Sequence, residues 1–305
     1  MKAENKAYLG LHLAIFLWGF TAILGKLIDF GEMLLVWHRL WITCLSFLLI
    51  PGLYRSLKAI PRNRIFIFGG IGILVALHWV AFYGSIKYSN ASLALSALAT
   101  SSLFTSIFEP LVMREKFKLW DILLGILVIF GIGLIASVSE VYTKGLVWGI
   151  AAAFLAAAFS ILNKKYLADY EGKAVSFVEL SVGFLFLSLL LPFTVDDLSI
   201  ATITPDAKNF IMLAILAVGC TTMPYILALN SLRYISAFKS NLAINLEPVY
   251  GILMAAAFLG ESDELSPKFY VGTFIILIAV FLKPIFKYTW NKVKTVSVNK
   301  GLKKP

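Results

Sequence analysis

The sequence predicts an all-α integral membrane protein whose ten transmembrane helices form two inverted five-helix repeats. Three observations support this fold class: the composition, the number of apolar segments and an internal repeat. Of the 305 residues, 60% are hydrophobic and only 14% are charged, and the mean hydropathy is +0.86. Soluble domains have about 45–50% apolar and about 25% charged residues, so this composition indicates a membrane protein.

Ten segments are long and apolar enough to cross a bilayer, whose hydrocarbon core requires about 20 residues of helix. The first segment is too long for the apolar region of a signal peptide, and no cleavage site follows it, so we expect it to be retained. Cys44 and Cys220 lie inside segments and are expected to be core residues. The predicted spans are Tyr8–Ile28, Leu34–Leu53, Ile65–Ser85, Leu93–Met113, Trp120–Val138, Gly145–Tyr166, Ala174–Thr194, Ala207–Leu229, Ala237–Leu259 and Pro267–Phe286.

The placement of charge predicts the orientation. If the N-terminus is cytoplasmic, 21 of the 27 basic residues fall in cytoplasmic segments, and most acidic residues fall in the outer loops. The positive-inside rule therefore predicts a multi-pass protein with both termini in the cytoplasm. We expect the protein to lie in a bacterial inner membrane. The net charge of +10 is explained by anionic lipid headgroups at the cytoplasmic face, so we expect no nucleic-acid partner.

The two halves of the sequence resemble each other. A shift of 146 positions without gaps pairs Ser85 with Ser231, Tyr88 with Tyr234, and Glu115 with Glu261. Five spans in each half force the second copy to enter from the opposite side, so the repeats are inverted. We expect a first repeat at 1–138, a second at 139–287 and a basic cytoplasmic tail at 288–305. Inverted repeats are typical of transporters that alternate access.

The ninth span is unusually polar for a transmembrane helix. Asn241 and Asn245 share a face with Pro248, whereas Glu247 points roughly 120–160° away from it. We expect Asn245 to bind a polar substrate, and Asn241 to bind substrate or to hold helices together. Glu247 lies near the middle of the bilayer, where a carboxylate is costly. It either takes part in ligand binding or proton coupling, or is paired within the bundle.

A second pair of charged residues lies nearer the cytoplasmic side. Lys239 and Glu179 are at similar shallow depths in the ninth and seventh spans. They either form a salt bridge or cytoplasmic gate, or Lys239 extends to the lipid headgroups. Arg39 lies near the outer end of the second span, and its guanidinium suits bidentate binding of a substrate carboxylate. The alternative is a structural arginine that pairs with Asp29 or Glu32.

Aromatic residues supply the remaining candidates for substrate binding. Trp79 and Tyr83 lie well inside the third span and are expected to line a pocket, although aromatic stripes are often ordinary core. Tyr225 follows Pro224, which frees the carbonyl of Cys220, so this span is expected to be broken. The complete candidate set for substrate binding is Trp18, Arg39, His78, Trp79, Tyr83, Tyr225, Asn241 and Asn245.

Several of these motifs resemble those of a known family. The first span contains Leu17-Trp18-Gly19, and related signatures occur at Tyr83–Lys116 and Ser231–Glu261. These features are similar to the EamA family of the drug/metabolite transporter superfamily. One departure is that Glu109-Pro110 falls eight residues later in register than Glu247-Pro248. The resemblance implies export or uptake of small metabolites such as amino acids, and we expect an exporter.

Other functions receive less support. A passive facilitator on the same scaffold remains an alternative, whereas an intramembrane enzyme is disfavoured because no catalytic motif or phosphate-binding loop occurs. The three histidines, His12, His38 and His78, have no carboxylate partner at metal-ligand spacing. We therefore expect no cofactor and no metal, and a small-molecule substrate as the partner.

Overall fold

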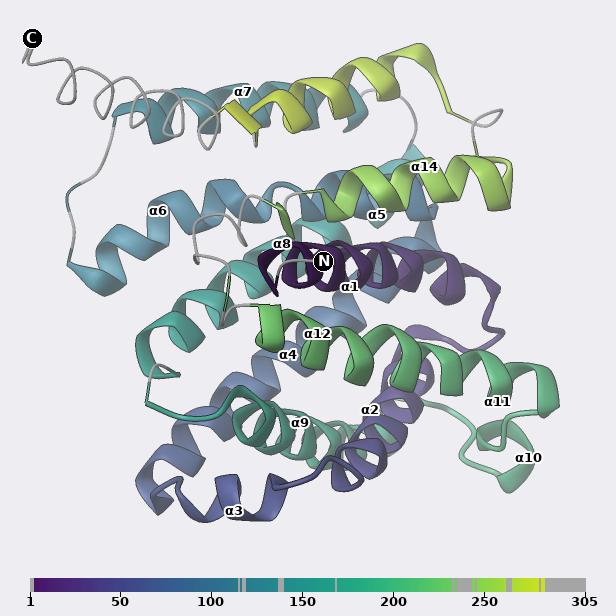
Figure 1. Cartoon of the computed structure of the whole chain (residues 1–305). Helices are drawn as coiled ribbons and strands as arrows, with labels where there is room; N and C mark the ends of the chain where they lie inside the picture. Colours follow the sequence, from purple (N-terminus) through teal and green to yellow (C-terminus); the bar gives the residue numbers. More distant parts are fainter. Residues whose placement is uncertain are drawn as a thin grey trace, which may run out of the picture.

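The computed structural model describes residues 3–114, 116, 119–136, 140–167, 169–231, 234, 243–244, 246–261, 265–279 and 281–282 (Figure 1). These residues form helices and short connections, and none of them lies in a β-strand. The helices are α1 (Ala3–Leu27), α2 (Glu32–Leu48), α3 (Leu53–Lys58), α4 (Arg62–Tyr88), α5 (Ala91–Leu98), α6 (Ser101–Met113), α7 (Leu119–Ala136), α8 (Glu140–Tyr166), α9 (Gly172–Thr194), α10 (Ile200–Ile203), α11 (Ala207–Ala214), the π-helix η1 (Ile215–Thr222), α12 (Met223–Ser231), α14 (Glu247–Leu259) and a further helix at Pro267–Ala279.

Six helical stretches of the described chain are long and apolar enough to cross a membrane. Three shorter apolar helices, Leu123–Ile135, Glu247–Leu259 and Pro267–Ala279, coincide with parts of further predicted spans. The prediction of an all-helical, multi-pass protein is confirmed. The six stretches are Asn5–Leu27, Arg62–Tyr88, Ala91–Met113, Thr143–Tyr166, Gly172–Thr194 and Ala207–Ala228.

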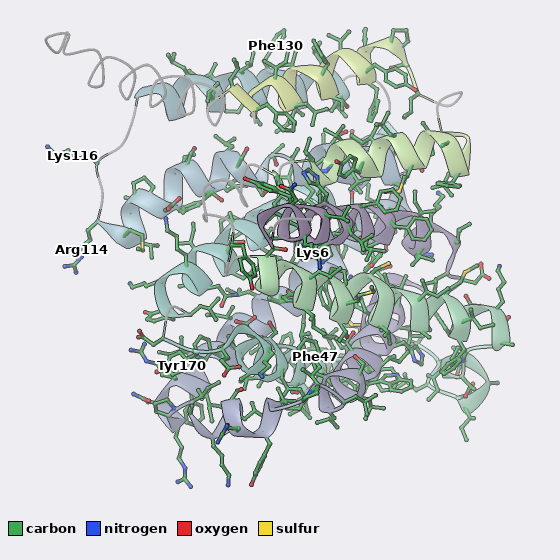
Figure 2. The ribbon with its side chains drawn as sticks, in the orientation of Figure 1. Lys6, Phe47, Arg114, Lys116, Phe130 and Tyr170 are labelled. Carbon is green, nitrogen blue, oxygen red and sulfur yellow. The ribbon has the colours of Figure 1, made fainter. Side chains whose placement is uncertain are left out.

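The outer surface of the bundle carries large apolar side chains. Phe130 of α7 is 59% exposed and extends away from the neighbouring helices (Figure 2). Leu123, Ile126 and Ile129 of the same helix are also exposed, and many exposed apolar side chains are typical of contact with a membrane or a partner. Arg114 and Lys116 extend from the end of α6 at the edge of the bundle (Figure 2), in the loop predicted to be cytoplasmic.

Two predicted spans differ from the structure in their boundaries. The second span was expected to continue to Leu53, but α2 ends at Leu48 and α3 begins only five residues later. The chain turns at Gly52, whose φ of 76° is in the left-handed region that glycine adopts without strain. The ninth span was predicted to run from Ala237 to Leu259. Among the described residues α14 begins at Glu247, so Pro248 lies in its first turn, where a proline costs no helical hydrogen bond.

Helix α4 lies in the core and packs against α8 and α9. The approach to α9 is close because glycines face each other: a Cβ at Gly72 would lie 2.0 Å from the carbonyl oxygen of Glu179, and one at Gly183 would lie 2.9 Å from the carbonyl oxygen of Gly72. Small residues that allow backbones to approach are the usual means of helix packing in a membrane.

Replacing Gly72 with alanine should therefore force α4 and α9 apart. We expect a loss of about 1–3 kcal/mol or more in stability, the usual cost of overpacking. The measurement is thermal unfolding of the purified protein in detergent. Gly70→Ala is the matched control, since no atom lies within 4 Å of a Cβ at this exposed position on the same helix. Equal stability of the two variants would contradict the close packing.

The end of α14 is attached to the beginning of α5 by one side chain. The Glu261 carboxylate accepts hydrogen bonds from the backbone N–H groups of Ala91 and Ser92, both at 2.8 Å, and only 3% of the residue is exposed. Asn90 accepts a third hydrogen bond from the N–H of Leu93. The first turn of α5 is thus capped, and its cap comes from the other half of the sequence. In the sequence, the repeat pairs Glu261 with Glu115, and this pairing does not predict the capping role.

Candidate functional site

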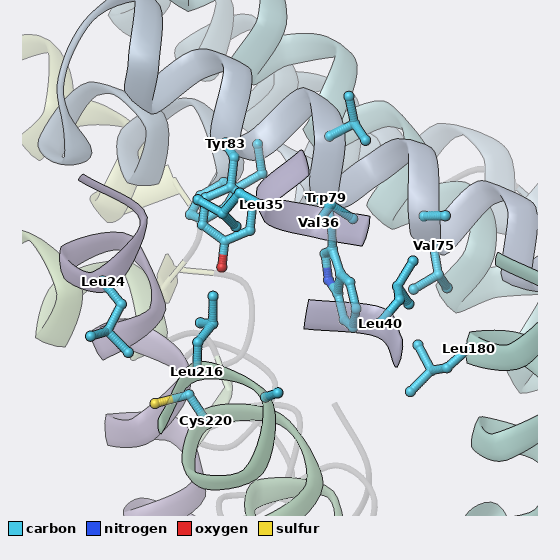
Figure 3. Close-up of a cluster of buried hydrophobic side chains, with 14 of the residues drawn as sticks. Leu24, Leu35, Val36, Leu40, Val75, Trp79, Tyr83, Leu180, Leu216 and Cys220 are labelled. Atoms are coloured by element: carbon cyan, nitrogen blue, oxygen red, sulfur yellow. The ribbon is translucent and has the colours of Figure 1, made fainter. Parts of the chain in front are cut away.

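The side chain of Arg39 lies at the meeting point of α2, α4 and η1. Its guanidinium is 3.7 Å from the ring centroid of Trp79, its Nη1 donates to the Tyr83 hydroxyl at 2.9 Å, and its Nε donates to Thr221 Oγ1 at 3.0 Å. Only 4% of Arg39 is exposed. Trp79 and Tyr83 extend from α4 toward Leu40 and Leu216 (Figure 3), so the charge is held by aromatic and apolar walls.

Arg39 forms no salt bridge within the described part of the chain, and Glu247 interacts with it only electrostatically. Every salt bridge found there involves a lysine, and Nη2 of Arg39 donates to no described residue. The alternative that Arg39 pairs with Asp29 or Glu32 is wrong. Asp29 binds Lys208 at 3.1 Å, and Glu32 accepts a hydrogen bond from Tyr88 at 3.4 Å. A buried guanidinium that has no carboxylate in direct contact favours the binding of an anion.

Aromatic residues extend the site from Arg39 toward α1 and α12. Trp18 of α1 packs edge to face on Tyr225 of α12, with ring centroids 6.1 Å apart. Tyr225 is close enough to interact electrostatically with Arg39, Glu179 and Glu247. The structure thus brings five sequence candidates, Trp18, Arg39, Trp79, Tyr83 and Tyr225, into one region.

The remaining sequence candidates are placed differently. His78 is buried, and its Nδ1 is 2.8 Å from the carbonyl oxygen of Ala152, so it joins α4 to α8 while stacking on Phe82. Glu247 is partly buried at the beginning of α14 and interacts electrostatically with Arg39. Lys239, Asn241 and Asn245 lie outside the described residues, so their roles stay predictions.

The π-helix η1 places Thr221 against Arg39. Thr221 and Thr222 donate their hydroxyl protons to the carbonyls five residues earlier, Leu216 at 2.9 Å and Ala217 at 3.2 Å. π-Helical segments are rare in proteins, and those that do occur are often found at functional sites. Pro224 follows two residues later and lacks an N–H, which explains why regular α-helical bonding is interrupted here. Pro224 predicted a break, but Thr221 was missed because a threonine inside an apolar span gives no specific signal.

His38 contributes to the outer end of the bundle. Its Nε2 is 2.9 Å from the carbonyl oxygen of Ile203, and its Nδ1 accepts a hydrogen bond from Trp41 Nε1 at 3.0 Å. These two contacts assign the proton to Nε2, since Nδ1 is the acceptor. His38 therefore attaches the loop that contains α10 to α2 and does not face Arg39. No group of three or more metal-ligating side chains occurs among the described residues.

The outer ion pair between Asp29 and Lys208 predicts a weak pH dependence of stability. The Lys208 ammonium, through its hydrogen bond and its charge, lowers the pKa of Asp29 below 3.8. A lowered pKa contributes stability above the ordinary value, and that stability is lost as the pH falls through the lowered pKa. We expect Asp29→Asn to lower the unfolding temperature slightly at neutral pH and not at all in strong acid, because exposed pairs are weak. A large effect at neutral pH would contradict this reasoning.

Taken together, a helical bundle of membrane-crossing length has the features of a membrane transporter when it surrounds aromatic walls and a buried arginine that forms no salt bridge with a described residue. The model of the EamA-like transporter family matches residues 5–137 and again residues 143–283. The chain therefore belongs to the EamA-like transporter family, and its resemblance to this family is confirmed.

Individual relatives agree with this assignment. An uncharacterized transporter of Clostridium kluyveri is 22% identical over 232 residues, which are 73% of this chain and 71% of that protein. The uncharacterized transporter YxxF of Bacillus subtilis is 24% identical over 204 residues, which are 64% of this chain and 62% of that protein. A solved crystal structure with 14% identity superposes with a TM-score of 0.61 over 92% of this chain and 97% of its own, which shows a shared fold.

Proposed function

We propose that this transporter exports small metabolites that carry a carboxylate, such as amino acids or related compounds, by alternating access. The observation that carries the proposal is the buried guanidinium of Arg39, which forms no salt bridge among the described residues. A substrate carboxylate would accept from the nitrogens that face the site and would supply the missing negative charge. The indole of Trp79 would limit how the guanidinium turns, which preorganises the site.

The proposed architecture is ten spans in two inverted repeats, 1–138 and 139–287, followed by a basic cytoplasmic tail at 288–305. Two separate matches to one family model support this division. Both termini lie in the cytoplasm of this proposed inner-membrane protein, and the basic loops contact anionic headgroups. The binding site draws on both repeats, because Arg39 comes from the first and Thr221 from the second.

The test is counterflow in proteoliposomes. Vesicles loaded with one unlabelled amino acid or organic acid are diluted into a trace of the same labelled solute. We expect labelled solute to accumulate transiently for at least one carboxylate of a broad panel, and efflux to be accelerated by substrate on the opposite side. Efflux that no solute on the opposite side accelerates would indicate a passive facilitator. Movement no faster than in empty vesicles for the entire panel would contradict the proposal.

A further inference from the structure

A buried acidic side chain in α9 is not used by the site described above. Glu179 is 4% exposed, and its backbone is covered by Gly72 of α4. Its Oε2 accepts a hydrogen bond from Asn163 Nδ2 of α8 at 3.5 Å. The other oxygens of these two side chains, Glu179 Oε1 and Asn163 Oδ1, are closed to solvent and have no hydrogen-bond partner among the described residues.

The two unpartnered atoms are both hydrogen-bond acceptors when Glu179 is ionised. A protonated carboxyl and a primary amide form a cyclic pair, in which the amide N–H donates to one carboxyl oxygen and the carboxyl O–H donates to the amide oxygen. The first of these bonds is present. The second needs one hydrogen on Glu179 Oε1, and that single hydrogen would give both unpartnered oxygens a partner.

Among the described residues, no positively charged side chain forms a salt bridge with Glu179. From α12, Tyr225 is the titratable side chain that interacts with it, and from α2 the thiol of Cys44 lies against Ser181. Helix α4 presents the backbone of Gly72. The nearby lysines are engaged elsewhere: Lys173 binds Glu171 and the Pro51 carbonyl, where α3 begins, and Lys164 binds Glu109 of α6.

We propose that Glu179 and Asn163 form a proton-binding site that couples transport to a proton gradient. Glu179 Oε1 takes a proton from hydronium when the site is open to one side. While the site is closed, the carboxyl O–H donates a hydrogen bond to Asn163 Oδ1, and the proton then passes to water on the other side. Each transfer breaks one O–H bond and forms another, so no other reactant is needed. The coupling part of this inference rests on the proposed transport function.

The proton site is separate from the anion site at Arg39. Hydrogen bonds from Trp37 to Ser188 and from Ser181 to Cys44 fix the antiparallel register of α2 and α9. In this register Glu179 lies seven residues along α9 from the level of Arg39, or about 10 Å at 1.5 Å per residue. Tyr225 of α12 interacts electrostatically with both groups.

The decisive variant is Glu179→Gln, because a glutamine amide N–H donates to Asn163 as the protonated carboxyl would. We expect counterflow exchange at the parental rate and complete loss of the stimulation by an imposed pH gradient. The matched control is Glu171→Gln, which replaces an exposed acid just before the same helix. This variant should keep both the exchange rate and the stimulation by a pH gradient. Unchanged stimulation in Glu179→Gln would overturn the proposal.

A second measurement reports the proton directly. Infrared spectra of the reconstituted protein at neutral pH, without substrate, should contain a protonated-carboxyl band that Glu179→Gln removes and Asn163→Leu shifts. Normal counterflow without this band would show that Glu179 is ionised, for example through Lys239, and would overturn the proton site alone. If the band is present but the protein moves no solute, the proposed transport function and the proton coupling are contradicted. The proposal that Glu179 binds a proton would still stand.

Discussion

Replacing Arg39 by methionine should abolish transport of carboxylate substrates. Methionine fills part of the space but removes the charge and the donors, and truncating one partner of a buried charge pair typically costs about 2–5 kcal/mol. A loss near 3 kcal/mol corresponds to roughly a hundredfold weaker binding. Arg39→Lys keeps the charge but loses the planar fork, so we expect an intermediate loss. The measurement is the concentration of substrate that gives half-maximal counterflow.

The control for this prediction uses both a second site and a second ligand. Arg55→Met removes an exposed arginine from α3 and should leave transport unchanged. For Arg39→Met, the decisive quantity is the ratio between the transport of a carboxylate substrate and the transport of its neutral amide. A variant that folds poorly loses the transport of both compounds equally. If Arg39→Met keeps the parental preference for the carboxylate, Arg39 does not bind the substrate anion.

Replacing Glu261 by alanine should produce the largest loss of stability. The change leaves the buried N–H groups of Ala91 and Ser92 without acceptors, and each unsatisfied donor costs about 1–3 kcal/mol. We therefore expect a loss of roughly 2–6 kcal/mol, which is a large part of a typical folding free energy. Glu261→Gln retains one acceptor oxygen, so its stability should lie between that of the parental protein and that of Glu261→Ala. Thermal unfolding in detergent measures the effect.

The matched control for Glu261 is Asp196→Ala, which removes an exposed acid after α9. It should change the unfolding temperature little, because it satisfies no buried backbone group. Hydrogen exchange would locate the damage: the amides of the first turn of α5 should lose protection in Glu261→Ala and keep it in the control. Retained protection at these amides would contradict the capping role.

The helices were predictable because length and hydropathy are local properties of the sequence. Helices α4 and α9 begin and end within a few residues of the predicted spans. The break near Pro224 was also predictable, since a missing N–H acts on its own helix. The π-helical form of that break was not, because it depends on which carbonyls Thr221 and Thr222 select in the folded chain.

The candidate site was predictable only in part. Arg39, Trp79 and Tyr83 stand out because charged and polar aromatic groups are costly or distinctive within a span. Their mutual contacts could not be derived, since Thr221 is 182 residues from Arg39 and Tyr83 is 44 away. The unpartnered oxygens of Glu179 and Asn163 also appear only in the fold, because the sequence does not show which acceptors lack donors.

The contact between Glu261 and α5 has a consequence for how such a bundle can move. Glu261 lies in the second stretch that the family model matches, residues 143–283, and the turn it caps lies in the first, residues 5–137. In the proposed alternating-access cycle we therefore expect α5 and the end of α14 to move together, so that the two proposed repeats do not rock as independent halves. The hinges of the cycle are then to be sought away from this junction, where backbone hydrogen bonding is already irregular, as it is in η1.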